Sequence, residues 1–507
     1  MKSNYYISSV FWSSISRIIN SIVGFVSVPL LLHCYGIENY GILNIAAAAN
    51  GYMQLMDLGI NTGSIRFFSQ WKAEKKYNLI NRIAGTSITF YTIVGFINAA
   101  LLLLIAIFGR SLFSVSETQF IQLRMIFFIM ALFSITNWVS TVFNQLLISN
   151  EKIAYTQKVT SILNLLKLFL VWIAIKGELS LTLYYLILSL IYTGYLLCYA
   201  YTCKKEKYIY SFKFQFHWNE FKQIFTYSLS IFVLSIFQMT ASQSRPLILS
   251  IVASNGAETT AEYKIIEVFP VFIISLAGML SGILLPKACS MTATNDTKGK
   301  EKMAYDGTLY ASIFVTLLSF PVIINSSDLI RLYVGEEFLY LNKWILLMIG
   351  SVLIYLHTSP CSSLYLASGK VKEYVYSTII NCFISIFLNI ILCKRWGVGS
   401  SVIGYTYYVI AQTIFQYIFM YSHILNLNSI RIFKSYILPV GIGIVTSILF
   451  FILNKFVNWD LTCYSKYIQL LFIILKSIVW LIIYITLLHV SNIVNMKQLY
   501  IKFFQRN

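Results

Sequence analysis

Apolar runs of about 20 residues recur from one end of this chain to the other, separated by short polar stretches. An α-helix needs a run of that length to cross a bilayer, whereas the strands of a membrane barrel would show short alternating segments. Only 11% of the 507 residues are charged, against about 25% in a soluble domain. The sequence therefore predicts an all-α polytopic membrane protein.

We expect about fourteen transmembrane helices, and the distribution of lysine sets their orientation. Lysine clusters at 72–76 and 204–207 lie between spans, and such clusters mark the cytoplasmic side. Both termini are then cytoplasmic, and the net charge of +19 reflects orientation rather than nucleic-acid binding. The expected spans are 10–33, 41–65, 84–108, 124–148, 155–175, 181–203, 224–253, 263–286, 306–327, 344–367, 375–393, 401–424, 436–456 and 467–490.

Catalytic and metal-binding chemistry is not indicated. The loops on the outer side are short, the longest being about 328–343, which leaves no room for an extramembrane catalytic domain. The eight cysteines are scattered without a C-x-x-C pair or a His/Cys spacing suited to a metal. We expect a transporter without a cofactor, and not an enzyme.

Similar short motifs recur at a constant spacing. Gly59 and Gly63 are followed 219 residues later by Gly278 and Gly282, and Ser149-Asn150 is followed at the same offset by Ser368-Gly369. Internal repeats are typical of transporters. We expect two pseudo-symmetric six-helix halves and alternating access between them. The predicted segments are 1–203, a cytoplasmic interfacial linker at 204–222, 223–424, and 425–507 with helices 13 and 14 and a cytoplasmic tail.

Ionisable residues at membrane depth are costly and usually face a cavity or a partner. Most of those in this chain are cationic, and Arg presents a planar fork that matches phosphate oxygens. The sequence therefore predicts a cationic cavity for an anionic cargo. The candidate residues are Arg17, Asp57, Lys167, Arg245, Glu267 and Lys476 within spans, and Arg66 and Lys264 at or near span ends.

Other interpretations of these residues stay open. Arg66 and Lys264 can simply extend to lipid headgroups, and Asp57 can neutralise an arginine in a structural pair. His357 lies in the polar stretch H-T-S-P-C-S-S, where Pro360 interrupts a span. Such an interruption either lines a substrate path or is a kink satisfied by local hydroxyl groups.

The residues around Asp57 resemble those of a known family. Tyr40-Gly41, then Leu55-Met-Asp57-Leu-Gly59 and Arg66-Phe67-Phe68-Ser69, are similar to the bacterial polysaccharide (O-antigen) flippases. These belong to the MOP (multidrug/oligosaccharidyl-lipid/polysaccharide) exporter superfamily. The V-P-L-L-L of the first span and the fourteen-span layout agree, so the resemblance covers essentially the whole chain.

The resemblance implies a role in lipopolysaccharide biosynthesis. The implied cargo is an undecaprenyl-pyrophosphate-linked oligosaccharide, moved between leaflets of the bacterial inner membrane among membrane lipids, with the polysaccharide polymerase as a further partner. Arg17, Arg66 and Arg245 lie in spans comparable to those that carry arginines in relatives that flip the peptidoglycan precursor. Such a precursor flippase and a MATE-type small-molecule antiporter remain alternatives. A membrane polymerase or ligase would need a sizeable periplasmic loop with acid and base residues, and the sequence predicts no such loop.

Overall fold

The computed structural model describes residues 2–209, 214, 216–368, 372–456 and 465–491. All regular elements within these residues are helices, which confirms the predicted all-α fold. Ten of the described helical segments are long and apolar enough to cross a membrane. Many of their large apolar side chains are exposed, such as Phe108 at 70% and Leu132 at 71%, as lipid-facing side chains are. The exact number of fourteen spans stays a prediction.

The helices follow one another with short connections. Their bounds are α1 (Lys2–Met53), η1 (Gln54–Asp57), α2 (Ile60–Ala73), α3 (Tyr77–Phe108), η2 (Gly109–Ser111), α4 (Glu117–Ser149), α5 (Ile153–Lys176), α6 (Leu181–Lys205), α7 (Trp218–Val252), α8 (Gly256–Ala293), α9 (Thr297–Ile324), α10 (Ser326–Tyr333), η3 (Glu336–Leu341), α11 (Asn342–Leu356), α12 (Ser359–Ser368), α13 (Lys372–Trp396), α14 (Val398–Phe415), η4 (Gln416–Ile424), α15 (Ser429–Phe456) and α16 (Lys466–Val490).

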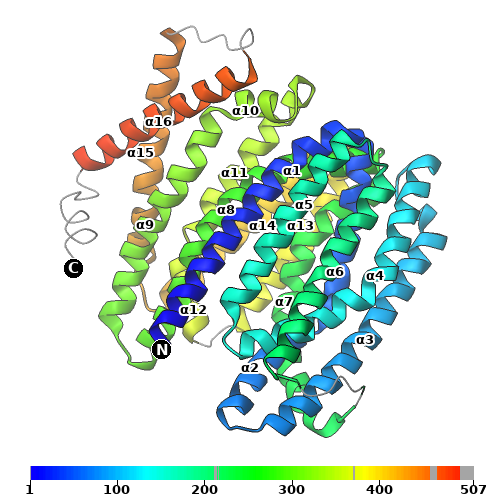
Figure 1. The fold of residues 1–507 in the computed structure, drawn as a ribbon. Coiled ribbons are helices and arrows are strands. Elements are labelled where there is room, and N and C mark those ends of the chain that lie inside the picture. Colours follow the sequence, from blue (N-terminus) through cyan, green and yellow to red (C-terminus); the bar gives the residue numbers. More distant parts are fainter. Residues whose placement is uncertain (1, 210–213, 215, 369–371, 457–464, 492–507) are drawn as a thin grey trace. The chain divides into compact units, whose positions relative to one another are not determined.

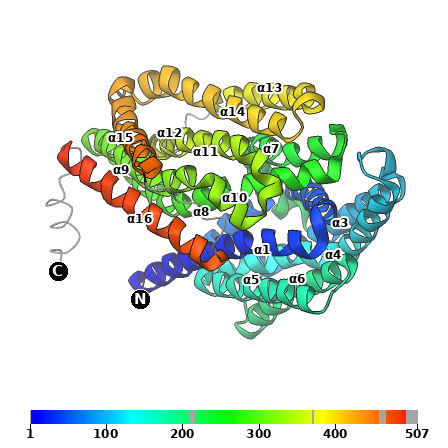
Figure 2. The same cartoon turned by 90° about the horizontal axis from the view of Figure 1, so that it is seen from above.

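The chain forms two compact units. Unit 1 consists of Met1–Ile265 and Cys382–Ser401. Within it α1 lies beside α5, α3 beside α4, and α4 beside α6 (Figures 1 and 2). Helix α7 packs on α1 and α2, so it joins the helices that precede it. The two predicted six-helix halves stay a prediction.

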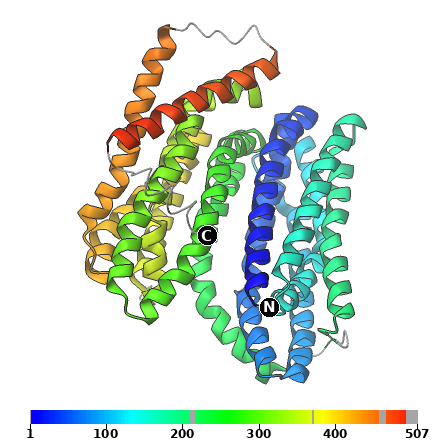
Figure 3. The ribbon, with the colours of Figure 1, turned by 60° about the vertical axis from the view of Figure 1, so that its left-hand side comes forward.

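Unit 2 consists of Ile266–Asn381 and Val402–Asn507. Helix α9 packs against α11, α12 and α15, and a core of buried side chains from α8, α9, α12 and η4 holds these helices together. Figure 3 shows α15 in orange and α16 in red crossing at an angle.

Three helix interruptions shape the two units. Gly36, with φ of 75°, turns the chain inside α1, where the first two expected spans meet. The expected span at 41–65 is not continuous, since η1 ends at Asp57, and Leu58 and Gly59 have φ of 51° and 74° before α2 begins. The third interruption lies between Leu356 and Ser359, which confirms the break expected near Pro360.

Glycines allow α7 and α8 to approach the first helices closely. A Cβ on Gly41 would overlap the carbonyl oxygen of Ala257, and a Cβ on Gly59 would lie 2.7 Å from the carbonyl oxygen of Ser228. At Gly63 a Cβ would overlap the hydroxyl of Ser228. Small residues at these positions let backbones pack where lipid supplies no hydrophobic driving force.

We predict that Gly41→Ala destabilises the protein by about 1–3 kcal/mol, because the added methyl group overpacks a backbone contact. Thermal unfolding of the purified protein in detergent measures this change. The matched control is Gly24→Ala, since Gly24 is exposed on α1 and has nothing within 4 Å of its Cβ position. Equal unfolding temperatures for the two variants would contradict the predicted close contact.

Candidate functional site

A cavity of about 470 Å³ lies within unit 1, beside the interruption between η1 and α2. We call it the Asp57 cavity. Small-molecule sites commonly have volumes of about 300–1,000 Å³. Its lining residues come from α1 to α4, α6 and α7: Asn50, Gln54, Leu55, Asp57, Leu58, Gly59, Asn61, Thr62, Asn98, Met130, Phe133, Ser134, Asn137, Trp138, Thr141, Tyr185, Ser189, Tyr192 and Phe232.

Each carboxylate oxygen of Asp57 accepts a hydrogen bond from the protein. Its Oδ1 accepts a hydrogen bond from the hydroxyl of Tyr91 at 2.5 Å, and its Oδ2 accepts one from the backbone N–H of Asn61 at 3.3 Å. The second bond satisfies a donor in the first turn of α2, where a negative charge is also favoured by the helix dipole. Tyr91 is fully buried and its hydroxyl accepts from Nε2 of Gln145 at 3.0 Å. The carboxylate is therefore fixed at the edge of the cavity.

Amide side chains and hydroxyl groups supply the remaining polarity of the cavity. Four asparagines and one glutamine line it. In the part of the chain that the structure describes, the buried Oδ1 atoms of Asn61 and Asn98 have no hydrogen-bond partner. Asn98 is only 3% exposed, so its unsatisfied acceptor is unusual at this depth. The composition of the lining therefore suits a ligand with hydroxyl or amide groups.

Aromatic side chains form part of the same lining. Trp138 stacks on Tyr91 with ring centroids 5.9 Å apart, and Tyr185 and Tyr192 come from α6. Aromatic faces and amide groups together provide the surfaces that a polar ring with C–H groups can use. Among the described residues that line the cavity, Asp57 is the one member of the group Asp, Glu, Lys, Arg and His.

The predicted cationic residues of unit 1 are not among the described residues that line this cavity. Arg17 is exposed on α1. Arg66 is exposed on α2, and its guanidinium lies 4.2 Å from the centroid of the Tyr227 ring. Arg245 is buried on α7, and its Nη1 donates to the hydroxyl of Tyr263 at 3.1 Å. Lys264 follows Tyr263 directly and is half-buried. Arg245 and Lys264 thus both lie beside Tyr263.

Two further candidates belong to unit 2. Glu267 is half-buried on α8. His357 is buried in the break between α11 and α12, its Nε2 lies 2.8 Å from the hydroxyl of Tyr417, and its ring stacks on Tyr436 with centroids 3.8 Å apart. His357 therefore packs within an aromatic cluster that joins the broken helix to η4 and α15.

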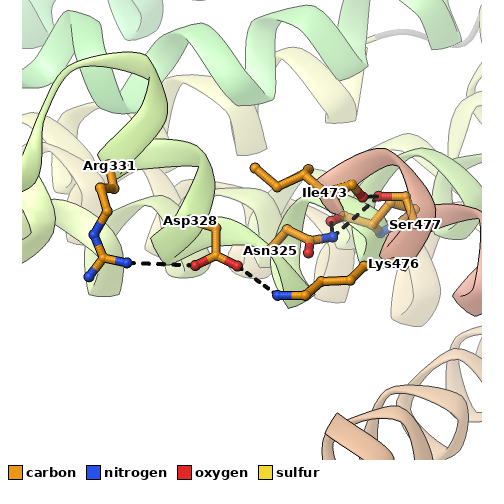
Figure 4. Close-up of polar contacts among 7 residues, drawn as sticks. Asn325, Asp328, Arg331, Ile473, Lys476 and Ser477 are labelled. Atoms are coloured by element: carbon orange, nitrogen blue, oxygen red, sulfur yellow. Dashed lines mark hydrogen bonds and ion pairs between the residues drawn. The ribbon is translucent and has the colours of Figure 1, made fainter. Parts of the chain in front are cut away.

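Lys476 belongs to an ion-pair network. Its Nζ on α16 lies 3.0 Å from Oδ2 of Asp328 on α10, and Oδ1 of Asp328 lies 3.8 Å from Nη1 of Arg331 (Figure 4). Asn325 also donates to the hydroxyl of Ser477 at 3.2 Å. Lys476 is only 8% exposed, so the pair anchors the last helix to α10.

The sequence interpretation missed Tyr91, Gln145, Asn98 and Trp138. Asn98 and Gln145 lie inside strongly apolar stretches, G-F-I-N-A-A-L-L and N-Q-L-L-I, and that isolation was a usable signal. Tyr91 and Trp138 gave no such signal, because Tyr and Trp are common throughout this chain.

We predict that Lys476→Met lowers the free energy of unfolding by about 1–3 kcal/mol, because it leaves Asp328 without its cationic partner on α16. Chemical unfolding in detergent measures this effect. Lys466→Met is the control, since Lys466 is exposed at the start of the same helix. A loss of transport with unchanged stability would instead favour a direct contact between Lys476 and cargo.

The fold is shared with solved transporters. The structure "Lipid II flippase MurJ, inward closed conformation" matches with a TM-score of 0.71 and 16% identity, covering 96% of this chain and 100% of that chain. An inward-facing multidrug resistance MATE family transporter of the MOP superfamily matches with a TM-score of 0.67 and 13% identity, over 83% and 98% of the two chains. The MATE multidrug transporter DinF-BH matches with a TM-score of 0.61 and 16% identity, over 82% and 95% of the two chains.

A family assignment comes from the sequence itself. No curated protein sequence matches the chain. The sequence model of the polysaccharide biosynthesis protein family matches residues 7–287, more than half of the 507 residues. This segment includes Asp57 and all the described residues that line the Asp57 cavity. The chain is a member of the polysaccharide biosynthesis protein family, and its fold is similar to that of the solved MurJ and MATE structures.

Proposed function

We propose that this protein is a flippase that moves an undecaprenyl-pyrophosphate-linked oligosaccharide, an O-antigen-type repeat unit, from the inner to the outer leaflet of the bacterial inner membrane. Its termini are cytoplasmic, and its cargo reaches the membrane-spanning core from the cytoplasmic side. The polysaccharide polymerase machinery then receives the repeat unit at the outer leaflet.

The observation that carries this proposal is the chemistry of the Asp57 cavity in a chain of this family. Amide groups of Asn61 and Asn98 and the faces of Trp138 and Tyr192 suit a sugar, whose ring offers hydroxyl groups at its edge and C–H groups on its faces. A purely apolar cargo would leave these buried polar groups unsatisfied.

The pyrophosphate is assigned to arginine. Arg245 lies deep in α7 beside Pro246, and its guanidinium fork matches phosphate oxygens. Arg17 and Arg66, exposed on α1 and α2, attract the anionic headgroup as it enters. The polyprenyl tail stays in lipid beside α15 and α16. Lys264, Glu267 and His357 are further candidates for cargo binding, and Lys476 supports the fold of unit 2 through its ion pair with Asp328.

The membrane potential favours this direction of movement. A pyrophosphate diester with about two negative charges gains roughly 4–5 kcal/mol when it moves outward across 100 mV, inside negative. Asp57 or Glu267 can additionally exchange a proton to return the empty carrier. A transport rate that is insensitive to both potential and pH gradient would rule out this driving mechanism.

One observation favours a second function. Since Asp57 is the one formally charged residue among those described in the lining, the cavity also suits a cationic small molecule, as in a MATE-type antiporter. Efflux of cationic dyes from cells that express the protein separates this function from lipid flipping. A peptidoglycan-precursor flippase is the related alternative, and the identity of the accumulated lipid decides between the two.

We predict that Arg245→Ala abolishes the ability of the protein to clear lipid-linked repeat units from the cytoplasmic leaflet, because the pyrophosphate loses its buried cation. The measurement is leaflet location in cells that lack the protein and receive wild type or variant. Arg110→Ala is the control, since Arg110 is exposed in η2.

The outcomes separate the site from the function. Equal rescue by wild type and Arg245→Ala would reject Arg245 as the phosphate site and leave the flippase proposal standing. Repeat units could also reach the outer leaflet in cells that lack both this protein and any other flippase. That result would reject the proposed flippase function.

A further inference from the structure

We propose that the Asp57 cavity selects the sugar of the cargo by charge: it accepts a neutral or amine-bearing sugar and excludes a sugar that carries a carboxylate. The inference rests on the proposed function, since it concerns the saccharide part of the flipped lipid. It adds a substrate class that the family assignment does not give.

The fixed carboxylate of Asp57 is the first reason. Tyr91 and the backbone of Asn61 donate to its two oxygens, so the carboxyl group is held in one position at the edge of the cavity. These donors belong to the protein scaffold, so the carboxylate cannot turn away from a ligand. An acidic sugar would bring a second negative charge beside it, where little water screens the repulsion.

The composition of the lining is the second reason. Among the described residues of the Asp57 cavity there is no Lys, Arg or His that could neutralise an acidic sugar. An amine on the sugar would instead complement Asp57. The cavity therefore rejects a carboxylate without needing any contact specific to the rest of the sugar.

The unsatisfied amides are the third reason. Asn98 and Asn61 line the cavity, and their Oδ1 atoms are acceptors that pair with no protein donor in the described part of the chain. Hydroxyl, amine and acetamido groups supply a donor to such an acceptor, whereas an ionised carboxylate group at the same position of the sugar supplies none. The acceptors and the charge of Asp57 thus favour the same class of sugar.

A bound metal ion does not explain the same features. No group of three or more His, Cys, Asp or Glu side chains that could hold a metal occurs among the residues that the structure describes. Asp57 is the one carboxylate among the described residues of the lining. A sugar with several donors uses the asparagines as well as Asp57.

The test uses two matched lipids in vesicles that contain the full-length protein. One undecaprenyl pyrophosphate carries a single N-acetylhexosamine and the other a single hexuronic acid, and an impermeant sugar-modifying reagent measures how fast each lipid changes leaflet. We expect wild type to move the N-acetylhexosamine lipid at least about tenfold faster, which corresponds to about 1.4 kcal/mol.

Asp57→Asn should raise the rate for the hexuronic acid lipid and so lower the ratio of the two rates. The control Glu117→Gln changes an exposed carboxyl at the start of α4 and should leave the ratio unchanged.

A second variant keeps the test decisive if Asp57→Asn does not fold. Thr62 is an exposed residue of the lining, so Thr62→Lys adds a cation without disturbing buried packing. It should speed movement of the hexuronic acid lipid, whereas the neutral Thr62→Gln should not.

Equal wild-type rates for the two lipids, or a faster hexuronic acid lipid, would overturn the inference and leave the flippase proposal intact. An unchanged ratio in both Asp57→Asn and Thr62→Lys would also overturn it. If folded wild-type protein moves neither lipid, the proposed function fails together with the inference.

Discussion

A backbone that leaves the helical path inside a bilayer must find hydrogen bonds within the protein, because hydrocarbon offers none. In unit 1 the interruption at Leu58–Gly59 meets this constraint through Asp57, which caps the first turn of α2 and accepts from Tyr91. Tyr91 in turn accepts from Gln145 on α4. One hydrogen-bonded chain therefore connects η1, α3 and α4, and it holds open the polar cavity on which the proposed function depends.

Close backbone approach is the second element of the architecture. Gly59 and Gly63 let α7 pack against α2, and Gly41 lets α8 approach the end of α1. Helix α7 consequently groups with the six helices that precede it in sequence. The wall contributed by Phe232 of α7 completes the Asp57 cavity. Gly41 and Gly59, which belong to the segments that resemble a family motif, thus have a packing role that a side chain at those positions would prevent.

The charges of the chain divide into two kinds of environment. Asp57 lies at a polar cavity, whereas Arg245 and Lys264 lie around Tyr263 and Lys476 lies in a network with Asp328. For a lipid-linked saccharide this division is useful, because the sugar and the pyrophosphate need different chemistry. Amides and aromatic rings suit the sugar, and guanidinium groups suit the phosphates. A carrier that bound both parts in one strongly cationic cavity would distinguish poorly among acidic and neutral repeat units.

The sequence by itself determined the all-α membrane fold, since apolar runs of bilayer length with few charges allow no other stable arrangement in lipid. It also predicted the helix break near Pro360, because a proline is a local signal, and it singled out Asp57 as a candidate site residue, because a charge at membrane depth is another. Only the tertiary structure decided which polar residues meet: Asp57 with Tyr91 and Gln145, and Lys476 with an aspartate 148 positions away. Those pairings depend on how the helices pack. The neighbouring helices determine which face of each helix is buried, and the sequence of that helix alone does not.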